Sequence, residues 1–146
     1  MPNAVKPIPD GYHTVTPYLT VTGVANLLEF LKQAFDATVV ECMKRPDGTV
    51  MHAEARIGDS IVMMGEAQGD WKPKPSNLYV YVKDVDAVYR QALRAGATSL
   101  REPANQFYGD RSGGVQDASG NQWWIATHVE DVAKDEMARR AAAAGH

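Results

Sequence analysis

His52 and Glu54 are the residues whose types and spacing are best suited to chemistry. They lie two positions apart in segment 49–57, where apolar and polar residues alternate as in a strand. Side chains two positions apart on a strand share a face, so the imidazole could act as a base that the carboxylate orients. Such a catalytic pair could remove a proton next to a carbonyl group or anchor a ligand. The alternative is that His52, Glu54 and Arg56 form a charge-compensated row that faces solvent or a second subunit.

Large aromatic side chains in three other predicted strands suggest a binding pocket. Segments 14–21, 78–82 and 121–128 alternate, with one row apolar and suited to packing on helices. The opposite row must then share one face, and there we predict ligand contacts from Thr16, Tyr18, Asn77, Tyr79, Tyr81 and Trp124. A cup lined by rings and a few polar groups is typical of a small-molecule pocket. A row that merely faced solvent would usually carry smaller and more polar residues.

Two loop segments supply further candidate contacts. Trp71 could close over the cup as a stacking lid, or pack against a partner subunit instead. Asp110 and Arg111 follow Phe107, and either could hydrogen-bond a polar ligand, with Arg111 offering a planar fork of donors. A structural salt bridge or a turn cap is the alternative for this pair. We include Phe107 among the predicted ligand contacts.

The order of the predicted elements is repeated along the chain. Three prolines predict an extended lead-in over residues 1–12. A strand, a helix and three strands follow in 13–66, and after a Gly- and Pro-rich loop at 67–77 the same order returns in 78–129. Residues 130–146 have the composition of a helical tail. The sequence therefore predicts an α+β fold of two βαβββ modules within one structural domain.

Composition excludes several classes of function. The chain has 146 residues, 45% of them hydrophobic, which is ordinary for one globular domain. A net charge of −3 argues against a nucleic-acid partner, and the single cysteine, Cys42, cannot form an internal disulfide. No apolar run approaches the ~20 residues of a membrane span, and the first ten residues lack the pattern of a signal peptide. We therefore expect a cytoplasmic protein with no membrane partner.

Several short motifs occur in an order that resembles a known superfamily. They are Pro17-Tyr18-Leu19-Thr20-Val21 and the segments 30–35, 51–59, 82–88, 109–111 and 117–123. Together they resemble the vicinal oxygen chelate superfamily, in its glyoxalase/bleomycin resistance/dioxygenase branch with PhnB-like members. The similarity runs from about residue 13 to residue 140. It implies that the paired modules form a curved mixed sheet, a glyoxalase-like cup that holds a small ligand, usually in a homodimer.

Some members of that superfamily hold a divalent metal at the floor of the cup. Alignment by the shared motifs places Thr16, Met63, Asn77 and Trp124 at the four metal-ligand positions. None of these side chains suits a metal such as zinc, nickel, iron or manganese, so we expect no metal cofactor and assign Met63 to ligand contact instead. A metal recruited by His52, Glu54 and a third residue such as His128 is the remaining alternative.

The resemblance and the residues together predict a glyoxalase/bleomycin-resistance-type protein. We expect it to bind a small aromatic or cationic organic molecule without metal, because electron-rich rings attract such ligands by stacking and cation–π contact. The alternative is a lyase or isomerase that acts on a small carbonyl compound or thiol adduct, with His52 as base and Glu54 or Asp110 assisting. Strands with free edges also favour a homodimer.

Overall fold

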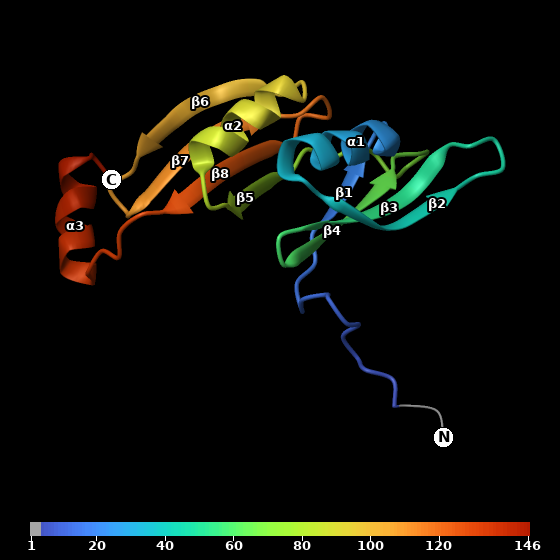
Figure 1. Cartoon of the computed structure of the whole chain (residues 1–146), viewed down its shortest axis with the longest axis horizontal. Coiled ribbons are helices and arrows are strands. Elements are labelled where there is room, and N and C mark those ends of the chain that lie inside the picture. Colours follow the sequence, from blue (N-terminus) through green and yellow to red (C-terminus); the bar gives the residue numbers. More distant parts are fainter. Residues whose placement is uncertain (1–3) are drawn as a thin grey trace. The chain divides into compact units, whose positions relative to one another are not determined.

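The computed structural model describes residues 4–146, which divide between Pro75 and Ser76 into two compact units. We call them module 1 and module 2 and describe each by itself (Figure 1). Module 1 contains β1 (Tyr18–Val21), α1 (Val24–Phe35), β2 (Thr38–Lys44), β3 (Val50–Ile57) and β4 (Ser60–Glu66). Module 2 contains β5 (Asn77–Tyr81), α2 (Val85–Arg94), β6 (Thr98–Asn105), β7 (Asp110–Gln116), β8 (Gln122–His128) and α3 (Lys134–Ala143). The predicted α+β fold of two βαβββ modules is confirmed.

Each module forms a four-stranded mixed sheet. The strand order is β1-β4-β3-β2 in module 1 and β5-β8-β7-β6 in module 2, and the first pair of each is parallel. The registers correspond, because Tyr18 lies opposite Met63 and Tyr79 lies opposite Trp124, with 61 residues between equivalent positions. The two sheets are therefore repeats of one architecture.

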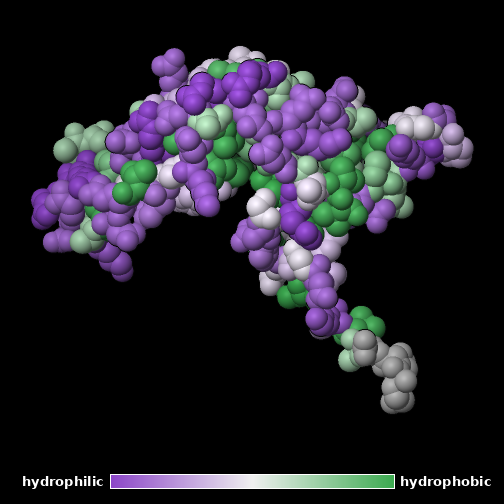
Figure 2. All heavy atoms as spheres, viewed as in Figure 1, coloured by the Kyte–Doolittle hydropathy of each residue, from purple (hydrophilic) through white to green (hydrophobic). Residues whose placement is uncertain are grey.

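Each sheet packs its own helix on one face. In module 1 the helix α1 contacts β3 and β4, and in module 2 the helix α2 contacts β6, β7 and β8. The cores between helix and sheet include Leu31 and Met64 in module 1, and Trp123 and Ile125 in module 2, all of them fully buried. Hydrophilic residues cover the outward sides of α1 and α2 in Figure 2. We call the other face of each sheet its helix-free face, and it carries the predicted site residues of the strands with the exception of Arg111.

A strand residue fixes the start of each helix. The N-cap of α1 is Gly23, which has no capping side chain, and the Glu66 carboxylate instead accepts the Gly23 and Val24 N–H groups at 2.8 and 3.0 Å. At the equivalent place in module 2, the Thr127 hydroxyl accepts the Val85 N–H at 2.9 Å. These contacts satisfy N–H groups that a helix cannot pair internally, and they tie each helix to its sheet.

Two predicted segments differ in the structure. The strand predicted from residue 14 begins only at Tyr18, and Val15 is 82% exposed rather than turned inward. Pro17 has no N–H for a ladder, and the Thr16 hydroxyl donates to the His13 carbonyl at 3.0 Å, which makes a local turn. In module 2, Asp110 and Arg111, which the sequence analysis places in a loop segment, begin the strand β7.

The motif at residues 117–123 is a structural turn. The buried Asp117 carboxylate accepts the Trp123 indole N–H at 2.9 Å and the backbone N–H groups of Ser119 and Asn121. It thereby holds the β7–β8 connection against the core. Among the described residues, no helix is long and apolar enough to cross a membrane.

Candidate functional site

The helix-free face of module 1 brings His52 and Glu54 together. Both lie on β3, and His52 Nε2 is 2.8 Å from Glu54 Oε2. The other carboxylate oxygen, Oε1, accepts a short hydrogen bond from the hydroxyl of Tyr12, which comes from the segment before β1. The Tyr18 ring lies beside the imidazole, with 5.7 Å between ring centroids. The carboxylate is therefore buried between a histidine and a tyrosine.

These contacts set the charge of the pair. Burial by itself would raise the pKa of Glu54, but the hydrogen bonds from His52 and Tyr12 outweigh it and hold that pKa below its ordinary value. The same hydrogen bond to Glu54 raises the pKa of Tyr12. At neutral pH the cluster is thus a carboxylate, a neutral phenol and an imidazole whose Nε2 faces the carboxylate. Such an arrangement orients the imidazole and leaves Nδ1 for another partner.

Module 1 also has a hollow of about 390 Å³, which shares Tyr12 with this cluster. The segment before β1 forms most of its wall, and the predicted contacts Thr16 and Met63 both line it. Its complete lining is Pro7, Ile8, Pro9, Tyr12, His13, Thr14, Thr16 and Met63. The lead-in therefore forms part of the candidate site rather than only preceding it.

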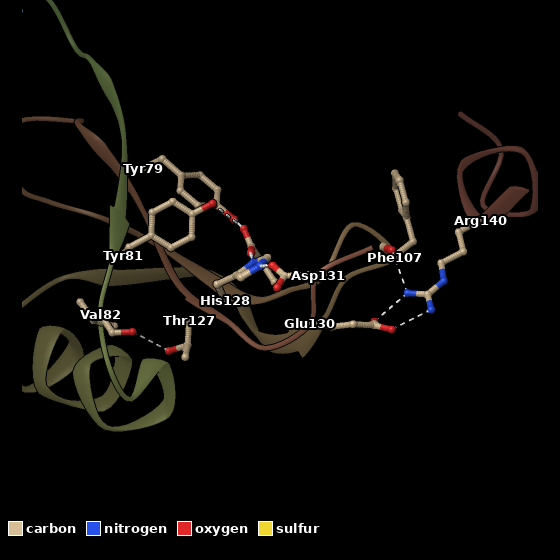
Figure 3. Close-up of polar contacts among 10 residues, drawn as sticks. Tyr79, Tyr81, Val82, Phe107, Thr127, His128, Glu130, Asp131 and Arg140 are labelled. Atoms are coloured by element: carbon tan, nitrogen blue, oxygen red, sulfur yellow. Dashed lines mark hydrogen bonds and ion pairs between the residues drawn. The ribbon is translucent and has the colours of Figure 1, made fainter. Parts of the chain in front are cut away.

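The helix-free face of module 2 carries a second carboxylate cluster, centred on Asp110. Asp110 Oδ2 accepts the hydroxyls of Tyr79 at 2.7 Å and Tyr81 at 2.9 Å. Its other oxygen, Oδ1, is 2.8 Å from His128 Nδ1, and the Asp110 side chain is only 5% exposed. Figure 3 shows the two tyrosine hydroxyls turned to the same point, next to His128 and Asp131. The buried carboxylate therefore fixes two rings whose centroids lie 5.2 Å apart.

The charges of this second cluster follow from its hydrogen bonds. Burial would raise the pKa of Asp110, but His128, Tyr79 and Tyr81 outweigh it and lower that pKa. Burial, followed by hydrogen bonds to Asp110 and Tyr108, raises the pKa of Tyr79 far above its ordinary value. Hydrogen bonds to Asp110 and Asp131 raise the pKa of His128. The centre is thus an ionised carboxylate that accepts hydrogen bonds from two neutral phenols and one imidazole.

Trp124 lies on the same face, is half-buried, and contacts Gly114 and Arg101. Its ring lies so close to Gly114 that any Cβ there would collide with it, so this glycine is required. The Arg101 guanidinium lies over the ring, with its carbon 5.1 Å from the centroid. Arg101 Nη2 also donates to the buried Ser112 hydroxyl at 3.0 Å. The Trp124 ring and the Ser112 hydroxyl therefore both hold the Arg101 guanidinium in place.

The other predicted contacts lie apart from these clusters. Arg111 is on the helix side of β7, where it forms two hydrogen bonds of 2.9 Å with Asp86 of α2. Phe107 packs against Tyr108 and His146, and its carbonyl accepts Arg140 of α3 (Figure 3). Trp71 is 63% exposed in the loop after β4. Asn77 begins β5, opposite Gln122.

Sequence reasoning missed several members of both clusters. Tyr12 gave no signal, because it lies in a lead-in without periodicity, and Arg101 was treated only as a strand residue. His128 ends the alternating row Gln122, Trp124, Ala126 and His128 on the predicted pocket face, but it was not named among the predicted ligand contacts. That alternation was the available signal, since it places His128 on the face of the tyrosines.

Comparison with known proteins identifies the family. The sequence profile of the Glyoxalase/Bleomycin resistance protein/Dioxygenase superfamily matches residues 12–125. The chain belongs to this superfamily. Uncharacterized protein Mb0911c of Mycobacterium bovis is 34% identical over 134 residues, covering 84% of this chain and 88% of the relative. Uncharacterized protein Rv0887c of Mycobacterium tuberculosis matches at the same identity, with 79% of its length covered.

Several solved structures share the fold. TioX from Micromonospora sp. ML1 matches with a TM-score of 0.70 and 22% identity, covering 80% of this chain and 99% of that one. The PhnB protein from Bacillus cereus matches with a TM-score of 0.63 and 19% identity, over 79% of this chain and 99% of that one. At these identities the likeness concerns the fold alone.

The metal that some glyoxalase-superfamily members hold does not fit the aligned positions in this chain. A hydroxyl, a thioether, an amide and an indole stand there, from Thr16, Met63, Asn77 and Trp124. The Thr16 hydroxyl already donates to His13, and Trp124 has no lone pair to offer. Among residues 4–146, no three His, Cys, Asp or Glu side chains converge to hold a metal ion. These donors do not form a first shell of the usual kind.

Proposed function

We propose that this glyoxalase-superfamily protein binds a small aromatic or cationic organic molecule on the helix-free face of module 2, without metal. The observation that carries the proposal is the anchored tyrosine pair. Tyr79 and Tyr81 are 45% and 63% exposed, yet both hydroxyls are held by one buried carboxylate. Exposed rings that are fixed in this way lose little entropy when a ligand stacks on them.

The charge of Asp110 favours a cationic or electron-poor ligand. Each phenol donates to an ionised carboxylate, which makes its ring more electron-rich, and a cation over such a ring gains about 0.5–2 kcal/mol. The part of the proposal that excludes a metal rests on the side-chain chemistry at the four aligned positions. Binding of this kind fits sequestration or resistance rather than turnover.

Substitution of the exposed Tyr81 ring tests this function, because the fold does not depend on that ring. Isothermal titration with a cationic aromatic probe such as tryptamine should show binding that Tyr81→Leu weakens about tenfold or more, since a ring contact is lost. Tyr81→Phe is the matched control, because it keeps the ring and removes only the hydroxyl. Equal binding to the wild type and the Leu variant would place the ligand elsewhere. Stoichiometric zinc, nickel, manganese or iron in the purified protein would contradict the metal-free part.

A lyase or isomerase function is the second candidate, and the 2.8 Å contact between His52 and Glu54 favours it. If Glu54 accepts the Nε2–H, Nδ1 is the atom that could remove a proton from carbon next to a carbonyl group. Exchange of that proton for deuterium, followed by NMR with small carbonyl compounds and their thiol adducts, measures this step. Exchange should cease in His52→Ala and persist in His146→Ala, at a histidine outside module 1. Equal exchange in His52→Ala and the wild type would eliminate the candidate.

A further inference from the structure

We propose that Arg101 binds an anionic group, so that the preferred ligand carries a carboxylate in addition to its aromatic or cationic part. This inference rests on the proposed function, because it concerns the same face of module 2. Neither the sequence pattern nor the family assigned a role to Arg101. The inference depends on how the guanidinium is held, on its charge balance and on its place beside Asp110.

Arg101 is held in place although it is exposed. Its guanidinium lies over the Trp124 ring at 5.1 Å, and Nη2 donates to Ser112 at 3.0 Å. An ordinary surface arginine samples many rotamers and loses that freedom when it binds an anion. Stacking on an aromatic face together with a fixed hydrogen bond removes much of this cost in advance, and the remaining nitrogens, Nε and Nη1, keep their donors.

The positive charge of Arg101 has no carboxylate partner among residues 4–146. Arg111 and Arg140, by contrast, each pair with a carboxylate through two nitrogens, on Asp86 and Glu130. Those two arginines are thus neutralised within module 2. Arg101 instead contacts a neutral ring and a neutral hydroxyl, which position its charge without cancelling it.

The place of Arg101 connects it to the tyrosine pair. Asp110, Ser112 and Gly114 are successive residues on the helix-free face of β7, and Arg101 lies opposite Gly114. At about 3.3 Å of rise per residue, Ser112 is only about 7 Å along the strand from Asp110. The guanidinium that bonds Ser112 and the carboxylate that bonds the tyrosines therefore flank one short stretch of surface. Small molecules with a ring or ammonium group at one end and a carboxylate at the other match this pair of charges.

Four indole compounds separate the two ends of such a ligand. Tryptophan carries an ammonium and a carboxylate, tryptamine only the ammonium, indole-3-propionate only the carboxylate, and 3-methylindole neither. We expect each carboxylate compound to bind the wild type about tenfold more tightly than its counterpart without one, as a charge-assisted hydrogen bond implies. In Arg101→Gln that advantage should disappear, while the affinity for tryptamine stays within about twofold.

Two controls and a second readout complete the experiment. Arg45→Gln removes an exposed guanidinium from module 1, one that donates to the Gln68 side chain, and should change none of these affinities. Titration of acetate alone should shift the Arg101 Nε–H resonance of the wild type, and far-ultraviolet circular dichroism checks that Arg101→Gln folds.

The outcomes distinguish this inference from the proposed function. If tryptamine binds and Tyr81→Leu weakens it, but the carboxylate compounds bind no better and Arg101→Gln has no effect, the role of Arg101 is overturned and the binding function stands. If none of the four compounds binds at concentrations up to about 10 mM, both are overturned.

Discussion

Asp110 is the residue on which the architecture of the module 2 site depends most. Its buried carboxylate accepts hydrogen bonds from Tyr79, Tyr81 and His128, so that one side chain fixes three others. Asp110→Asn should lower the free energy of unfolding by about 3 kcal/mol, because an amide cannot accept all three donors and leaves polar groups unpaired. Urea denaturation measures this change. Asp131→Asn, at a fully exposed side chain, is the control, and an equal loss there would contradict the prediction.

The pairing of His128 predicts a pH dependence of stability. Asp110 and then Asp131 raise its pKa in the folded protein, while Tyr79 and Tyr81 donate to the same Asp110 carboxylate and Tyr108 hydrogen-bonds Tyr79. A raised pKa means that the stabilisation is complete below the unfolded value of about 6.5 and is lost as the pH rises through the folded value. The difference in unfolding free energy between the wild type and His128→Ala should therefore be larger at about pH 6 than at about pH 8.5. A difference that does not vary with pH would show that the imidazolium is not what Asp110 stabilises.

Among the elements, α1 shows most directly how a strand can determine a helix. Its first N–H groups are accepted by Glu66 of β4, since Gly23 offers no side chain. Glu66→Ala should cost about 1–2 kcal/mol of unfolding free energy, the range for lost helix caps. Glu66→Gln keeps one acceptor oxygen and should fall between the two. Glu29→Ala, on the exposed side of α1, serves as the control in the same denaturation series, and a loss as large as that of Glu66→Ala would show that the cap contributes nothing.

Element periodicity explains which parts of the site could be predicted. Because strand side chains alternate, the sequence indicates that Tyr79, Tyr81 and Trp124 share a face and that His52 faces the same way as Glu54. The same rule separates Asp110 from Arg111, but it could not be applied to them, since the sequence analysis placed both in a loop segment rather than in a strand.

Contacts between distant segments could not be predicted in this way. Tyr12 reaches Glu54 across 42 residues, from a lead-in whose path no periodicity determines. Arg101 covers Trp124 only because β6 and β8 both flank β7 in the sheet, and the sequence contains no signal for that order. The identities of ring-bearing residues were thus predictable, whereas the partners that orient or cover them depend on tertiary structure.

At the scale of the whole molecule, one repeated architecture carries two different polar centres. The repeat of 61 residues preserves the strand order and the register. In both modules, a residue of the last strand also accepts an N–H group at the start of the helix. In both modules a buried carboxylate forms hydrogen bonds with a histidine and a tyrosine. The equivalent strands β3 and β7 carry it at different places, since Glu54 lies in the middle of β3 whereas Asp110 begins β7. The scaffold therefore tolerates a carboxylate cluster at different positions, which separates the fold from the choice of ligand.

The exposed rings on the helix-free faces lead to a prediction about assembly. Tyr18 is 49% exposed on module 1, and Tyr79 and Tyr81 are 45% and 63% exposed on module 2. We propose a homodimer in which a second copy covers the helix-free face of module 1, because this would remove the exposed Tyr18 ring from water and does not use the face of module 2 on which we propose that the ligand binds. Light scattering at micromolar concentration should then give twice the chain mass of 16.0 kDa.

A charge placed on the face tests whether that face forms the interface. Tyr18→Glu should shift the mass toward that of one chain, since burying an unpaired carboxylate costs several kcal/mol. Val5→Glu adds the same charge at a residue of the lead-in that is 93% exposed, outside both sheets, and should leave the dimer intact. A wild type that scatters as a single chain overturns the dimer. A dimer that persists in Tyr18→Glu as in Val5→Glu would move the interface to another surface, and the helix-free face of module 1 would then remain open to ligand.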